Sequence, residues 1–89
     1  MKLFMVHVGY YDKSVGEGIY EIHLNHFVAA EDAKDAKNKA QNLKEFKDKS
    51  MHIDGIKELS TVDGYKVTLA GDPNPVSGQV LSYDESKEL

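Results

Sequence analysis

The chain has 89 residues, the size of one domain with a single modest core. It contains no Cys, which excludes disulfides, thiolate metal sites and a Cys nucleophile, and which fits a reducing interior. The net charge is −4 and all 11 basic residues are Lys. Because Arg is the side chain that forks onto phosphates and guanine edges, we expect no nucleic-acid partner. No apolar run approaches the roughly 20 residues of a membrane span, so we expect a cytoplasmic protein without a membrane partner.

Residues 2–10, KLFMVHVGY, predict a first strand that is apolar on both faces. One face would carry Phe4, Val6, Val8 and Tyr10, and the other would carry Leu3, Met5, His7 and Gly9. A strand of this kind is usually covered on both sides. Residues 12–18 have the Gly, Asp and Ser content of a loop. The alternation in residues 19–29 predicts a second strand, antiparallel to the first.

The hydrophobic period changes to that of a helix over residues 30–47. The inward face would consist of Ala33, Ala36, Ala40, Leu43 and Lys47. Because this face is mainly Ala, the helix can lie close to a sheet but buries little area by itself. We expect one amphipathic helix that is stabilised by docking.

Residues 56–62 and 65–70 flank an Asp63-Gly64 pair and predict a hairpin, because a type I′ turn needs positive φ at both central positions. Residues 72–89 are rich in Pro, Ser and acidic side chains and are typical of a partly flexible tail. The predicted fold is α+β, in the order β-β-α-β-β, with one antiparallel sheet covered on one face by a single helix within residues 1–71. The other face needs a second cover, which a homodimer or the tail could supply.

Four segments follow one another in a recognisable order: LFMVHVGY in the first strand, HFVAA before the helix, then HID and VDGYKV. In this order they resemble a family of small bacterial proteins catalogued as a domain of unknown function. The resemblance covers roughly residues 2–70 and leaves out the tail. A bulky aromatic residue often follows HID in that family, whereas this chain has Gly55 and Ile56. The resemblance implies a bacterial cytoplasmic domain, and it implies no activity, cofactor or catalytic residue.

The histidines are the main candidates for chemistry. His7, His23, His26 and His52 lie in or beside predicted strands, and Asp54 follows His52 by two positions. Imidazole and carboxylate groups ligate Zn²⁺ and similar ions, and Cys-free sites of this type tend to be catalytic. His23 and His26 are three residues apart, which places them on opposite faces of a regular strand. The candidate polar site is therefore His7, His26, His52 and Asp54, provided that the strand registers let them converge.

His52 and Asp54 could also form an acid–base pair in which the carboxylate orients the imidazole. On an extended strand the two side chains would lie about 7 Å apart, and a turn at Asp54-Gly55 would shorten that distance. We favour the alternative that Asp54 caps a turn through a backbone bond. We likewise favour histidines that are hydrogen-bonded as part of the scaffold, and we predict no catalytic residue, no metal and no cofactor.

Tyr10, Tyr11 and Tyr20 flank the first loop, and Tyr is enriched at protein interfaces. Together with Leu3 and Met5 they form the candidate interface. We expect a non-enzymatic protein-interaction or self-association module, with a homodimer as the simplest assembly. The alternative is a His/Asp-dependent metal-binding protein or hydrolase-like enzyme.

Overall fold

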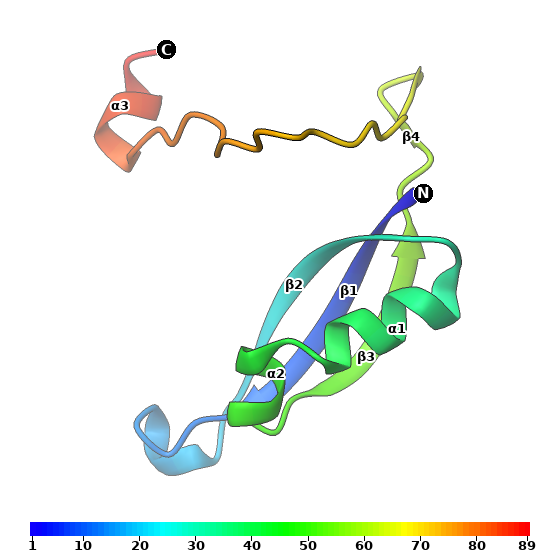
Figure 1. Ribbon diagram of the computed structural model, residues 1–89. Coiled ribbons are helices and arrows are strands. Elements are labelled where there is room, and N and C mark those ends of the chain that lie inside the picture. The colour runs from blue at the N-terminus through cyan, green and yellow to red at the C-terminus, as the bar shows by residue number, and fades with distance from the viewer.

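The computed structural model describes all 89 residues, and its main element is a three-stranded antiparallel sheet (Figure 1). The strands are β1 (Lys2–Tyr11), β2 (Glu21–Ala30) and β3 (His52–Glu58), in the order β2-β1-β3. A short 3₁₀ helix, η1 (Gly16–Gly18), lies in the connection between β1 and β2. β1 is the central strand, in agreement with its apolar sequence.

The two faces of β1 separate as the alternation predicts. Phe4, Val6, Val8 and Tyr10 are buried on one face, where they form the centre of the core. Met5 and His7 on the other face are only half-buried. The register between β1 and β2 places Met5 opposite Phe27 and Gly9 opposite His23. One face of the sheet therefore carries the core, and the other we call the uncovered face.

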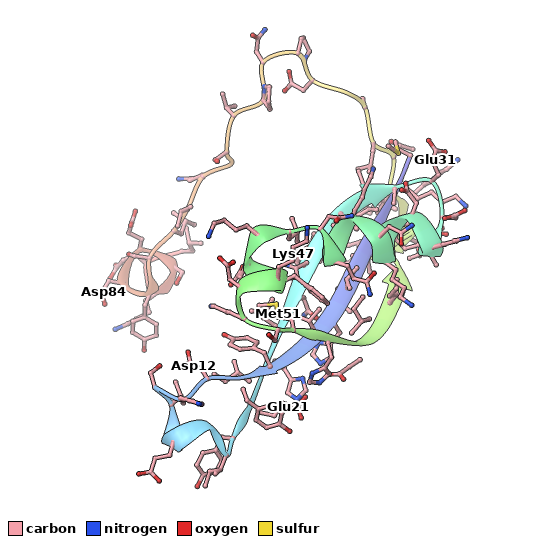
Figure 2. The ribbon with its side chains drawn as sticks, turned by 60° about the horizontal axis from the view of Figure 1, so that its bottom comes forward. Asp12, Glu21, Glu31, Lys47, Met51 and Asp84 are labelled. Carbon is pink, nitrogen blue, oxygen red and sulfur yellow. The ribbon has the colours of Figure 1, made fainter.

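Two helices, α1 (Ala33–Gln41) and α2 (Lys44–Asp48), lie over the core face (Figure 1). α1 begins after Asp32, whose carboxylate accepts a hydrogen bond from the amide of Asp35 at 2.8 Å, a typical N-cap. Ala36 and Ala40 are fully buried, as their spacing predicts. Met51 fills the space between the helices and the sheet (Figure 2).

The helix that the sequence predicts over residues 30–47 is divided in two. Leu43 has an extended backbone (φ −66°, ψ 138°), and the side-chain amide of Asn42 donates to the carbonyl of Asn38 at 2.8 Å. As a result Leu43 is 37% exposed, and Phe46 packs against the core in its place. The break thus adds a large aromatic side chain to a helical face that otherwise offers mainly Ala.

The predicted turn is confirmed, since Asp63 (φ 51°) and Gly64 (φ 81°) both have positive φ. It joins β4 (Thr61–Val62) to β5 (Tyr65–Lys66), which form a separate two-stranded ribbon. The first arm of the hairpin is shorter than predicted because Ile56–Glu58 belong to β3 of the main sheet. The α+β fold is confirmed.

The tail does not supply the second cover of the sheet. Residues 72–82 contain no helix or strand, and a short helix, α3 (Tyr83–Lys87), follows them. Figure 1 shows this segment leading away from the sheet, and Val76 and Val80 are largely exposed. None of the helices combines the length and the apolar character needed to cross a bilayer.

Candidate functional site

The uncovered face has an apolar part and a polar part. The apolar part contains Leu3 and Met5 from β1 and Phe27 from β2, whose side chain is 62% exposed. The polar part brings together imidazoles and carboxylates from all three strands. We call it the His–carboxylate cluster, and its members are His7, Glu21, His23, His52 and Asp54.

A β-bulge in β3 places Asp54 in the cluster. His7 is paired with Gly55 and Val8 with Ile53, so Asp54 is the extra residue without a partner on β1. The bulge brings Asp54 Oδ1 to 3.3 Å from His52 Nε2, less than half the separation expected on a regular strand. Asp54 lies within β3 and not at a turn, and its carboxylate contacts imidazoles, so the interpretation of Asp54 as the cap of a turn is wrong.

Gly9 forms the floor of the cluster at the centre of the sheet. A Cβ at this position would lie 2.3 Å from Glu21 Oε1, 2.7 Å from His52 Nε2 and 3.0 Å from Asp54 Oδ2. These are shorter than any normal contact. A side chain at residue 9 would therefore displace these polar groups from the positions that they occupy over β1.

The polar atoms of the cluster contact one another directly. His52 Nε2 lies 2.7 Å from Glu21 Oε1, within hydrogen-bond distance. His23 lies between the two carboxylates, with Nδ1 3.1 Å from Asp54 Oδ2 and Nε2 3.6 Å from Glu21 Oε1. These four side chains are 31–47% exposed. Glu21 projects from the side of the sheet opposite α1, as Figure 2 shows.

His7 joins the cluster through its ring. The rings of His7 and His23 are stacked, with centroids 5.1 Å apart and planes within 5° of parallel. His7 Nδ1 lies 2.7 Å from the side-chain oxygen of Asn25, the residue opposite it on β2. Because that oxygen can only accept, this hydrogen bond requires the proton on Nδ1.

The donor atoms form two sets that could each hold a cation. The first set is His7, His23 and Asp54, the second is Glu21, His52 and Asp54, and within each set the donor atoms lie within 4.8 Å of one another. Donors around one ion, at bond lengths near 2.1 Å, lie about 3.0–3.4 Å apart, so small side-chain rotations bring either set to ligand geometry. Imidazole with carboxylate suits Zn²⁺, Mn²⁺ or Fe²⁺.

Three of the four residues predicted for the polar site belong to the cluster, where Asp54 shares one donor set with His7 and the other with His52. His26 is not among them, because it is paired with Val6 and so lies on the core face, where its Nε2 is buried without a hydrogen-bond partner. The prediction that His26 converges with His7 and His52 is wrong, and His23 takes its place. The alternation along β2 puts His23 and Glu21 on one face, but only the register with Gly9 reveals that this face belongs to the cluster.

The five residues of the candidate interface do not lie on one surface. Leu3 and Met5 are on the uncovered face, whereas Tyr10 is buried on the core face with Lys49 Nζ 5.0 Å from the centre of its ring. Tyr11 and Tyr20 are exposed near the first loop. Tyr10 is therefore part of the core and is unavailable to a partner.

The cluster is an open surface site. The two hollows of the molecule, of about 320 and 360 Å³, lie elsewhere, one beside Leu3 and Leu59 and the other beside Tyr10. Hydrogen bonds from the side chain and amide of Ser14 lower the pKa of Asp12, and the hydrogen bond to Glu45 raises the pKa of Lys49. A ligand would thus reach the cluster directly from solvent.

Fold and site together define a small α+β protein whose three-stranded sheet bears imidazoles and carboxylates on its uncovered face. The family model of the Domain of Unknown Function DUF1543 matches residues 18–69, more than half of the chain, so the chain belongs to this family. The resemblance to a domain-of-unknown-function family is therefore confirmed. The match includes four members of the cluster, whereas His7 in β1 precedes it. No curated protein and no solved structure matches the chain.

Proposed function

We propose that this protein binds a divalent transition-metal cation at the His–carboxylate cluster. The observation that carries the proposal is the convergence of nitrogen and oxygen donors from all three strands over Gly9. Neutral imidazole and carboxylate are ligands that Zn²⁺, Mn²⁺ and Fe²⁺ accept, and no thiolate is needed.

Stability of the fold does not explain this arrangement. Exposed ion pairs contribute only about 0–1 kcal/mol each, so the contacts within the cluster add little to folding. Gly9 in the central strand is itself unfavourable by roughly 0.5–1 kcal/mol relative to Ala. Functional sites commonly retain residues that destabilise the local structure. A destabilising Gly beneath converging polar groups therefore supports a binding site.

The exposure of the cluster supports an ion with accessible coordination positions. Each set supplies three protein donors, and the side chains remain 31–47% exposed to solvent. Three protein ligands plus water is the arrangement found in catalytic zinc sites, whereas structural sites are closed by four. Water would complete the coordination here.

Thermal unfolding tests the proposal. The full chain is first treated with chelator and then scanned with Zn²⁺, Mn²⁺ or Ni²⁺ in turn. An ion at 100 times its Kd adds about 2.7 kcal/mol to the free energy of unfolding, which raises the Tm of a domain of this size by about 10 °C or more. Asp54→Ala, at the one residue that both donor sets share, should remove most of the rise, and His26→Ala, on the core face, should keep it. If no ion raises the Tm of the wild-type chain, the proposal is wrong.

We also propose self-association through the apolar part of the uncovered face as a second function. Met5 lies opposite Phe27, and Leu3 adjoins them on β1. Burial of a side chain as large as that of Phe contributes about 1.5–3 kcal/mol, so a second copy that covers this surface gains a substantial free energy. The proposed assembly is a homodimer in which the apolar parts of the two uncovered faces meet.

Sedimentation velocity over a range of protein concentrations tests the homodimer. Phe27→Glu should shift the equilibrium to the monomer, because it places a charge at the centre of the contact. Val76→Glu is the matched control, since Val76 is 87% exposed in the tail. A wild-type chain that is monomeric at every concentration would refute self-association.

Bacterial origin, a cytoplasmic location and the lack of a nucleic-acid partner stay predictions. The family resemblance supports a bacterial origin, the absence of Cys supports a cytoplasmic location, and the absence of Arg supports the lack of a nucleic-acid partner.

A further inference from the structure

We infer that the His–carboxylate cluster holds two cations, bridged by the carboxylate of Asp54. This inference rests on the proposed metal site and specifies its nuclearity. The two donor sets have only Asp54 in common, and each of them contains a full triad of ligands. A single ion could be bound by only one of the two sets.

The contacts of Asp54 are those of a bridging carboxylate. Its Oδ2 lies 3.1 Å from His23 Nδ1, on the side of the first set, and its Oδ1 lies 3.3 Å from His52 Nε2, on the side of the second. Each oxygen thus points to a different imidazole. A carboxylate that binds one metal through each oxygen holds the pair at the spacing of about 3.5–4 Å found in two-metal sites.

The bulge in β3 is what gives Asp54 this central position. As the residue without a partner on β1, it projects between His52, on its own strand, and His23, on the far strand β2. Gly9 lies beneath and leaves the space open. β1 and β2 then complete the first set with His7 and His23, and Glu21 completes the second.

A pair of ions in this cluster would need exogenous ligands to balance its charge. The cluster contains two carboxylates, which neutralise one divalent cation. A second cation leaves a net positive centre that is open to solvent. Water, hydroxide or an oxyanion would bind there between the metals, as in sites that orient a nucleophile.

The metal stoichiometry of the full chain tests the inference. Native mass spectrometry with Zn²⁺ should show two ions per chain, and Mn²⁺ should give the exchange-coupled electron paramagnetic resonance spectrum of a close pair. His7→Gln removes a ligand of the first set and Glu21→Gln removes one of the second. Each variant should retain one ion and show the six-line spectrum of isolated Mn²⁺. Asp54→Asn should weaken both ions, and His26→Gln should keep two coupled ions.

The outcomes separate the two proposals. One ion per wild-type chain, or two ions without magnetic coupling, would overturn the dinuclear site and leave the proposed metal binding intact. No ion at all would overturn both. The wild-type measurements decide this by themselves, so the result does not depend on whether a variant folds.

Discussion

Replacement of Gly9 by Ala should weaken metal binding although it removes no ligand. The added Cβ would lie 2.3 Å from Glu21 Oε1 and 2.7 Å from His52 Nε2. To restore a normal contact the Glu21 oxygen must move by about 1 Å. Metal–ligand distances tolerate only about ±0.2 Å, and the methyl group occupies the space into which Glu21 and His52 converge, so it hinders their rotation towards one ion.

The expected effect is measurable by thermal unfolding. Changes that disturb the orientation of ligands typically weaken metal binding by about 10–100-fold. At a metal concentration of 100 times the wild-type Kd, the stabilisation of about 2.7 kcal/mol falls to about 1.4 for a tenfold loss and about 0.4 for a hundredfold loss. The metal-induced rise in Tm should therefore be smaller by at least about 5–10 °C.

Gly55→Ala is the matched control. Gly55 lies in β3 opposite His7, and a Cβ there meets no atom within 4 Å. This variant should keep the full metal-induced rise. Without metal, Gly9→Ala should be as stable as the wild type or more stable by up to about 1 kcal/mol, since only mobile side-chain ends are displaced and Ala suits a strand better than Gly. If Gly9→Ala keeps the wild-type metal response, or both variants lose it equally, the role assigned to Gly9 is refuted.

Other predictions concern the fold. His26→Leu should raise the Tm by about 4–8 °C, because it removes a buried nitrogen without a partner, at a gain of about 1 kcal/mol; a fall in Tm would contradict this. Phe46→Ala should lower the free energy of unfolding in urea by about 2 kcal/mol, more than Leu43→Ala, because Phe46 and not Leu43 packs on the core; equal losses would indicate a continuous helix. A chain ending at residue 71 should keep its circular dichroism spectrum and lose less than about 0.5 kcal/mol, since the side chains at 76, 80 and 83 are exposed; unfolding would show that the tail supports the core.

The elements of the fold could be predicted from the sequence because they depend on local periodicity. Alternation along β1 identifies its core face, and the Asp63-Gly64 pair requires the turn that is observed. The helical period over Ala36 and Ala40 likewise identifies the buried face of α1. The helical period does not predict the break at Leu43, because the pattern continues through that residue. Only the packing of Phe46 on the core distinguishes two short helices from one continuous helix.

The site could be predicted only in part, because it depends on register. Residues 12–20 form a connection between β1 and β2 that is too long to fix the pairing as a two-residue turn would. His23 opposite Gly9 is a consequence of that register, so the sequence offered no reason to prefer His23 to His26. The bulge at Asp54 is likewise a property of the paired strands. It brings the side chains of His52 and Asp54 into contact, although a regular strand would hold them too far apart.

The bulge and the glycine together argue for a site more strongly than either does alone. The bulge lets Ile53 and Ile56, three residues apart, both pack against the core. Apolar residues two apart on a regular strand would achieve the same burial, so the core does not require the extra residue. What the bulge adds is a carboxylate between two imidazoles, directly above the one position in β1 that has no side chain. The bulge in β3 and the Gly in β1 thus lie at the same point on the uncovered face. A bound cation is the occupant that both of them fit.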